Sequence, residues 1–384
     1  MLQRDDSVNE RLWIYYQNTR GLRTKIDDIF LTTRDCNFDI IILTETGLDD
    51  CINSLQLFGD SFNVFRCDRS QLNSNKRRFG GVLIAVSNEH HSSIVETVSG
   101  RCLEQVCVCA TVRGKKFLIC GVYVPPDRSN ELETIEAHIS SVSELCRKCS
   151  ADETVLVCGD YNQPRICWTD GPDEAQLARN SYLTNASAAL IDGMDYLNLR
   201  QANLHRNHLG RVLDLVCCSL EQQLDTDVCV APLLPVDLHH PPLVMPMKAA
   251  EMNKCSSLVN TIGSSTALNY RKLNFDAFSD YFSNFNWGAM LANNNVDDMA
   301  SYFCNTICQW LNANLPVAKR PVSPPWSSPH LREFKRERNF WQRKHRLCKT
   351  ALVKQNFKRS SDAYRRLNAT LYKSYVMRVQ IELC

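Results

Sequence analysis

The stretch that decides the fold is Gly159-Asp160-Tyr161-Asn162-Gln163-Pro164, which directly follows the apolar run Val155-Leu156-Val157-Cys158. The apolar run predicts a buried strand. A strand that ends in Gly-Asp-x-Asn delivers a carboxylate and an amide side by side at the edge of a sheet. Such a pair suits a base that takes a proton from water and an amide that holds a phosphate oxygen. Because Gly, Asp and Asn also form ordinary turns, the rest of the chain must support this interpretation.

Polar residues recur at or just beyond the ends of other apolar runs. In chain order, these segments are Gln17-Asn18-Thr19-Arg20-Gly21-Leu22, Leu43-Thr44-Glu45-Thr46, Val122-Tyr123-Val124-Pro125, Leu213-Asp214-Leu215 and Asp237-Leu238-His239-His240-Pro241. The series therefore offers several groups with the chemistry needed at a single cleft.

Taken in order, the six segments resemble those of the endonuclease/exonuclease/phosphatase superfamily, which has the DNase-I-like fold. They are most similar to the apurinic-endonuclease-like nuclease domain of non-LTR retrotransposons, over about residues 10–248. The resemblance implies a four-layered α/β sandwich, in which two packed sheets are flanked by helices. It also implies the use of Mg²⁺, with Mn²⁺ as the alternative.

The chain of 384 residues is long enough for two domains, and its hydrophobic share of 44% is that of an ordinary globular protein. Strand-like and helical patterns are interspersed over about the first 240 residues, which predicts an α/β or α+β fold. We expect this domain at residues 1–248, a polar linker at 249–269 and a helical basic extension at 270–384. The extension resembles the segment that precedes the reverse transcriptase of retrotransposon polyproteins.

Positive charge is concentrated near the end of the chain. Residues 316–384 carry 17 Lys and Arg against 4 Asp and Glu, a net charge of +13, whereas the remainder has a net charge of −11. This predicts a polyanion-binding surface. We expect neither a membrane span nor a signal peptide, because the sequence has no long apolar run and its start is polar. The 19 cysteines are then expected as core residues in a reducing compartment.

Asn18 and Glu45 each follow a predicted buried strand and can face one cleft. A carboxylate with an amide or bound waters is a ligand set that Mg²⁺ accepts, because this ion keeps much of its hydration. In the family that the chain resembles, the Glu is the main metal ligand and the Asn assists. Arg20 stands where apurinic repair enzymes often have an acid, which counts against a second metal site. A surface Glu and a helix-terminal Asn are the alternative interpretation.

Four further residues are candidates for catalysis. Tyr123 lies near the end of a strand, and its hydroxyl can donate to a phosphate oxygen; a half-buried strand Tyr is the alternative. Asp160 matches the family's water-activating base, and Asn162 matches its amide partner. Asp214 lies in an apolar strand, where an unpaired carboxylate is costly. A place beside metal or phosphate explains Asp214 better than a solvent-facing edge strand does.

The segment Asp237-Leu238-His239-His240-Pro241 departs most from the family pattern Ser-Asp-His-x-Pro, because Val236 replaces the Ser and one residue separates Asp from the first His. We favour His240 as the histidine that contacts phosphate, with Asp237 on its other ring nitrogen. His239 is the alternative. A decayed, non-catalytic site is a third interpretation.

The resemblance implies in-line hydrolysis of a DNA phosphodiester, which leaves a 3′-hydroxyl that primes reverse transcription. We therefore predict a Mg²⁺-dependent endonuclease of a non-LTR retrotransposon. Its expected partners are DNA and, through the basic extension, element RNA; its expected location is intracellular, with the nucleus as the site of action. The alternatives are an abasic-site or other phosphodiesterase of the same superfamily, and a nucleic-acid-binding relic.

Overall fold

The computed structural model describes residues 11–70, 80–97, 103–112, 114–126, 130–150, 153–168, 177–178, 183–219, 224–248, 273–288, 296–315 and 324–383. The linker expected at 249–269 lies outside the described residues. The chain divides into two compact units, one formed by Met1–Met252 with Ser328–Cys384 and the other by Asn253–Ser327. The extension expected at 270–384 is therefore distributed over both units.

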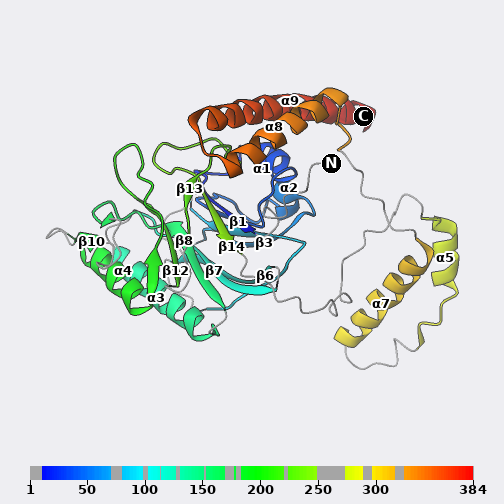
Figure 1. Cartoon of the computed structure of the whole chain (residues 1–384). Helices are drawn as coiled ribbons and strands as arrows, with labels where there is room; N and C mark the ends of the chain where they lie inside the picture. The colour runs from blue at the N-terminus through cyan, green and yellow to red at the C-terminus, as the bar shows by residue number, and fades with distance from the viewer. Residues whose placement is uncertain are drawn as a thin grey trace. The chain divides into compact units, whose positions relative to one another are not determined.

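The first unit is built around two sheets of six strands each (Figure 1). The strands of the first sheet are β1 (Arg11–Asn18), β2 (Ile40–Thr44), β3 (Phe62–Cys67), β4 (Val82–Ser87), β13 (Asp227–Val228) and β14 (Leu243–Lys248). Those of the second are β5 (His91–Ile94), β6 (Glu104–Val112), β7 (Lys115–Tyr123), β8 (Thr154–Asp160), β11 (Leu199–Gln201) and β12 (Asp214–Ser219). A separate short pair consists of β9 (Cys167–Trp168) and β10 (Leu177–Ala178).

The strand order places one parallel pair inside each sheet. The first sheet has the order β13-β14-β1-β2-β4-β3, and the second has β11-β12-β8-β7-β6-β5. Strands β1 and β2 are parallel, as are β7 and β8, whereas the other neighbours are antiparallel. Parallel strands need a crossover connection, and their carboxyl ends lie at the same edge. Side chains that follow β1 and β2, or β7 and β8, are thereby brought together.

Helices cover the outer faces of both sheets. The first unit contains α1 (Ile26–Thr33), α2 (Ser54–Phe58), α3 (Glu131–Arg147), α4 (Asn185–Tyr196), α8 (Pro329–Leu347) and α9 (Ala351–Leu383). The second unit contains α5 (Phe275–Ser283) and α7 (Val296–Asn314). In the first unit, α1 and α3 supply the crossovers of the two parallel pairs. None of the described helices has the length and apolar character needed to span a membrane.

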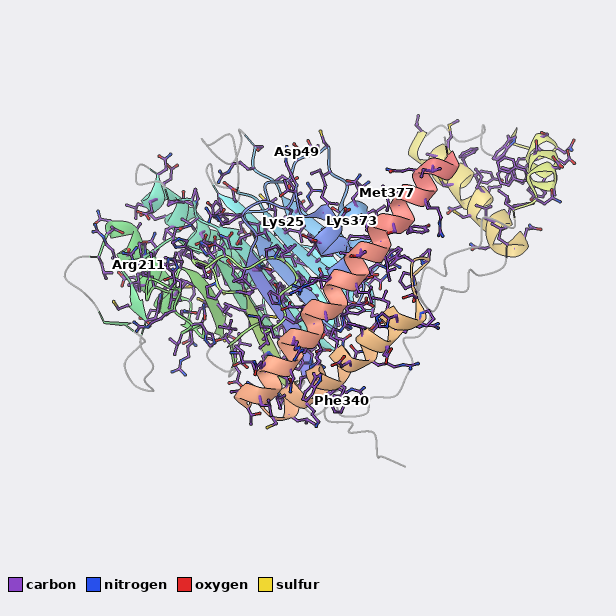
Figure 2. All side chains as sticks on the ribbon, turned by 90° about the horizontal axis from the view of Figure 1, so that it is seen from above. Lys25, Asp49, Arg211, Phe340, Lys373 and Met377 are labelled. Carbon is purple, nitrogen blue, oxygen red and sulfur yellow. The ribbon has the colours of Figure 1, made fainter. Side chains whose placement is uncertain are left out.

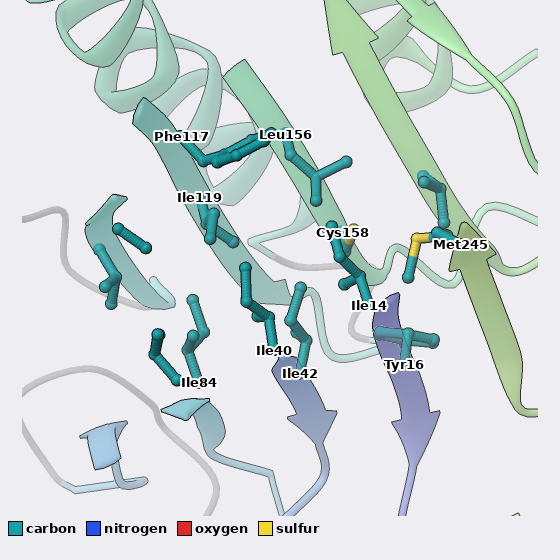
Figure 3. Close-up of a cluster of buried hydrophobic side chains, with 14 of the residues drawn as sticks. Ile14, Tyr16, Ile40, Ile42, Ile84, Phe117, Ile119, Leu156, Cys158 and Met245 are labelled. Atoms are coloured by element: carbon teal, nitrogen blue, oxygen red, sulfur yellow. The ribbon is translucent and has the colours of Figure 1, made fainter. Parts of the chain in front are cut away.

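The main core lies between the two sheets, as Figure 3 shows. Strand β2 contributes Ile40 and Ile42 to this core, and β7 and β8 contribute Ile119 and Leu156 from the other side. Alternate residues of β2, such as Ile41, face a second cluster with α1 and α2. This explains why β2 is apolar along its length, because both of its faces are covered.

A third cluster packs α3 and α4 on the outer face of the second sheet. The order across the first unit is therefore helices, sheet, sheet and helices, with the helical pair α8 and α9 added after the sandwich (Figure 1). The fold is the four-layered α/β sandwich with a helical C-terminal part that the sequence predicts.

Candidate active site

Polar side chains from both sheets meet at the edge where the parallel strands end. Asn18 is the last residue of β1, and Glu45 follows β2. Asp160 ends β8, where it is paired in register with Tyr123 of β7 on one side and with Asp214 of β12 on the other. The strand order thus aligns Tyr123, Asp160 and Asp214 in one row across the second sheet.

Asn18 links the two sheets through its side-chain amide. Its Nδ2 donates to Glu45 Oε1 at 3.1 Å and to Asp160 Oδ2 at 2.9 Å. Its Oδ1 accepts a hydrogen bond from the backbone N–H of Arg20 at 3.1 Å. In this orientation the amide nitrogen, which is not a metal ligand, faces the carboxylates. Asn18 therefore holds two carboxylates together, and its predicted role as a metal ligand stays a prediction.

The backbone is constrained at two of the candidate residues. Glu45 has a φ of 51° and Asn162 a φ of 50°, a region that residues other than glycine seldom occupy. The side chain of Asn162 donates to the carbonyl of Val124 at 3.0 Å, and its backbone N–H donates to Asp160 Oδ1 at 3.1 Å. Such strained conformations persist where neighbouring contacts impose them, and they concentrate at functional sites.

His240 joins this cluster through Asp214. Its Nδ1 lies 3.0 Å from Asp214 Oδ2, and its Nε2 lies 3.8 Å from Asp160 Oδ2. The Tyr16 hydroxyl donates to Asp214 Oδ1 at 2.7 Å and so holds this carboxylate in place. Sequence reasoning missed Tyr16, although its position two residues before Asn18 on one strand puts both side chains on the same face of the sheet.

The carboxylate beside His240 is Asp214, so the predicted contact of Asp237 with the His240 ring is wrong. Asp237 Oδ2 instead lies 3.0 Å from Arg20 Nη1, and Asp237 Oδ1 accepts a hydrogen bond from the backbone N–H of His239. The ring of His239 packs against His208, with 4.3 Å between ring centroids. Asp237 and His239 line a cavity of about 430 Å³ beside Asn18, and they do not share the hydrogen bonds of the buried cluster.

The electrostatics of the cluster favour a charged histidine. Burial alone would lower the pKa of His240, but the hydrogen bond and charge of Asp214, together with Asp160 and Glu45, raise it to about 9. Burial, and then repulsion from Asp214, raise the pKa of Asp160 well above its usual value. Burial and the neighbouring carboxylates Glu45 and Asp160 also raise the pKa of Tyr123, so its hydroxyl remains a donor at neutral pH.

The cluster has the donor groups that a divalent cation needs. Ligand atoms of Glu45, Asp160 and His240 all lie within 4.8 Å of one another. Glu45 and Asp160 both accept hydrogen bonds from the Asn18 amide, and burial raises the pKa of Asp160. A bound cation would offset the negative charge of these carboxylates and would favour their ionised forms. His240 directs Nδ1 to Asp214, which leaves Nε2 as the ring atom nearer to Asp160. Carboxylate oxygens such as those of Glu45 suit a hard cation such as Mg²⁺ better than the imidazole of His240 does.

No family model and no curated protein sequence matches the chain. Among solved structures, the endonuclease domain of TRAS1, a telomere-specific non-LTR retrotransposon, is similar at 13% identity with a TM-score of 0.43, over 62% of this chain and 99% of that one. An AP endonuclease from Archaeoglobus fulgidus is similar at 16% identity with a TM-score of 0.42, over 62% and 99%. A 3′-5′ exonuclease from Neisseria meningitidis is similar at 16% identity with a TM-score of 0.43, over 62% and 100%.

Likenesses of this size settle neither the fold nor the chemistry, which rest on the residues of this chain. The described residues form two six-stranded mixed sheets with helices on their outer faces and polar side chains gathered at one edge. The first unit of this chain is therefore a four-layered α/β sandwich.

Proposed function

We propose that the first unit is a metal-dependent phosphodiester hydrolase that nicks DNA and leaves a 3′-hydroxyl. The observation that supports this most strongly is the hydrogen-bonded convergence of Asn18, Glu45, Asp160, Asp214 and His240 from both sheets at one edge. Buried carboxylates whose environments push the pKa values of neighbouring groups apart are typical of catalytic sites.

In this proposal Asp160 is the base. With its charge offset by a bound cation, the Asp160 carboxylate would be ionised and would take a proton from a water molecule, which attacks the phosphorus. The bond to the 3′ oxygen breaks, and this oxygen takes up a proton from solvent to leave as the 3′-hydroxyl. Glu45, with Asn18 beside it, would hold the cation. When bound, Mg²⁺ supplies Lewis-acid polarisation of the phosphate and offsets the negative charge of the site.

Three donors of this chain suit the charge that develops on the phosphate. His240 carries a proton on Nε2 when it is an imidazolium, and Asp214 keeps its other nitrogen occupied. Tyr123 has a protonated hydroxyl with no hydrogen bond to any described residue. Asn162 uses one amide hydrogen on the Val124 carbonyl and retains a second one. Donors fixed before the reaction can stabilise such a transition state by several kcal/mol in total.

The retrotransposon role is the finer part of the proposal. Arg20 pairs with Asp237 next to Asn18. A positively charged guanidinium therefore lies where repair enzymes of the family that the chain resembles often carry an acid. This favours nicking of intact DNA over a repair reaction at abasic sites. A nick with a 3′-hydroxyl would provide the primer for reverse transcription, in a chain that acts in the nucleus.

The test is the conversion of supercoiled plasmid to the open circular form in Mg²⁺ or Mn²⁺. The wild-type chain should nick, and Asp160→Asn should not. Asp195→Asn is the matched control, because this exposed aspartate lies on α4, outside the cluster. Equal nicking by Asp160→Asn would refute the assigned base. Cleavage of an abasic duplex without cleavage of plasmid would favour the repair reaction instead.

A further inference from the structure

Helices α8 and α9 are fixed to the nuclease unit through Asp35, the residue after the C-cap of α1. The side chains of Lys335 on α8 and Tyr364 on α9 both bond to the Asp35 carboxylate. Arg338 also donates to the Asp35 carbonyl at 3.3 Å. We call the pair α8 and α9 the helical hairpin. One acidic residue of the sandwich, Asp35, thus contacts both of its helices.

Further contacts extend this attachment along the hairpin. The guanidinium of Arg346 stacks over the ring of Trp13 at 4.2 Å, and the rings of Phe30 and Tyr372 lie 5.9 Å apart. Phe357 on α9 is buried in the same interface, with 8% of its surface exposed. The hairpin is therefore held in a defined position on the sandwich.

The opposite face of α9 carries a row of basic residues, Arg359, Arg366 and Lys373, which we call the basic stripe. They are spaced seven residues apart, which is about 10.5 Å along a helix and close to two turns. All three are exposed, and none makes an ion pair or hydrogen bond through its side chain to a described residue. Their charges face water while the other face of α9 is packed.

Two contacts fix the direction of α9 along α1. Tyr364 meets Asp35 and the later Tyr372 meets Phe30, so α9 runs antiparallel to α1. The start of α1 follows Lys25, which lines the cavity beside Asn18. Figure 2 shows Lys373 in the later part of α9, close to Met377. Lys373, which directly follows Tyr372, therefore lies nearer the start of α1 than Arg359 does.

We propose that the basic stripe binds the phosphate backbone of the substrate duplex next to the part held at the cleft. The proposal rests on the proposed nuclease function, and charge complementarity identifies the partner. Outside residues 316–384 the chain has a net charge of −11, so the sandwich lacks an excess of positive charge for a polyanion. Regularly spaced basic side chains on a fixed helix supply positive charge for the phosphates and do not distinguish one base sequence from another.

The experiment compares the full chain with the triple variant Arg359→Gln, Arg366→Gln, Lys373→Gln. Binding to a labelled duplex is measured by anisotropy over a range of salt concentrations in EDTA, so that cleavage does not enter. The slope of log K against log salt is negative, and its magnitude should be smaller by about 2 to 3 in this variant than in the wild type, since each phosphate contact contributes about 0.9. The triple variant Lys116→Gln, Arg147→Gln, Arg200→Gln removes the same charge from exposed positions on the second sheet and α3, and its slope should not change.

Equal slopes for the wild type and the stripe variant, or equal losses in both triple variants, would overturn the proposal. A loss confined to single-stranded RNA would also overturn it, because the stripe would then serve an RNA partner. Circular dichroism should show that both variants remain folded. Plasmid nicking is scored separately: a chain that does not nick but loses slope in the stripe variant contradicts the proposed function and still supports the binding surface.

Discussion

A buried histidine under the Gly-Asp-x-Asn turn should make this fold sensitive to acid. His138 on α3 is fully buried, with Nε2 at 2.7 Å from the Tyr161 hydroxyl and Nδ1 at 2.6 Å from Gln105 Oε1. Gln105 Nε2 donates a hydrogen bond to the Ser141 hydroxyl, so Gln105 Oε1 is the atom that faces the His138 ring. The neutral ring then donates from Nδ1 and accepts from Tyr161 at Nε2. Burial lowers the pKa of His138 to about 3.

The size of the effect follows from this pKa. A histidine in the unfolded chain titrates near 6.5, so between about pH 6.5 and pH 3 the unfolded state binds a proton that the folded state does not. The contribution of His138 to stability is complete above about pH 6.5 and is lost as the pH falls. The loss is about 1.4 kcal/mol per pH unit, or about 3 kcal/mol by about pH 4.5.

Urea unfolding followed by circular dichroism between about pH 7 and pH 4.5 measures this loss. His138→Gln keeps a donor and an acceptor but does not titrate, so the wild type should lose about 3 kcal/mol more than the variant across this range. Other groups, such as Asp160, titrate in both proteins and cancel in the difference. An equal decrease of the free energy of unfolding in both proteins between about pH 7 and pH 4.5 would refute the reasoning.

Three further predictions concern the cluster and the helical hairpin. Glu45→Gln should lower nicking about a thousandfold with an unchanged melting temperature, because a cation ligand in a cleft adds little to the core; a plasmid assay checks the rate. His240→Ala should lose about a hundredfold, roughly 3 kcal/mol, whereas His239→Ala should lose little, and the reverse ranking in the same assay would transfer the role to His239. Tyr364→Phe removes the hydroxyl bonded to Asp35 and should cost about 1 to 3 kcal/mol, read as faster hydrogen exchange in α9; unchanged exchange would contradict the docking.

Local patterns were sufficient to predict the long strands of the sandwich, but not the short strands β5, β11 and β13. The run Ile40–Leu43 predicts a strand covered on both faces, and β2 has both faces buried. The spacing of Leu22, Ile26, Ile29 and Phe30 predicts a helix over residues 21–33, but the helix begins only at Ile26. Gly21 and Leu22 donate their backbone N–H groups to the carbonyls of Glu45 and Thr46, so this segment extends the alignment of β1 with β2 before the chain turns into α1.

The cluster was less predictable, because its contacts join residues far apart in the sequence. Asp237 lies three residues before His240, yet the two meet through their backbones, and the Asp237 carboxylate points to Arg20. The pairing of β12 with β8 places Asp214 beside Asp160, and its carboxylate meets the ring of His240, which comes 26 residues later in the chain. The docking of α8 and α9 on Asp35 likewise depends on residues about 300 positions away, which no local pattern encodes.

The most direct test of the nuclease assignment is a single gel that reports both cleavage and the chemistry of the new end. Supercoiled plasmid is incubated with the chain in Mg²⁺, and the product is then offered to a DNA polymerase with a labelled nucleotide. The wild-type chain should give open circles that take up label, and Asp160→Asn should give neither product. Nicks that do not accept label, or label that persists in Asp160→Asn, would contradict it.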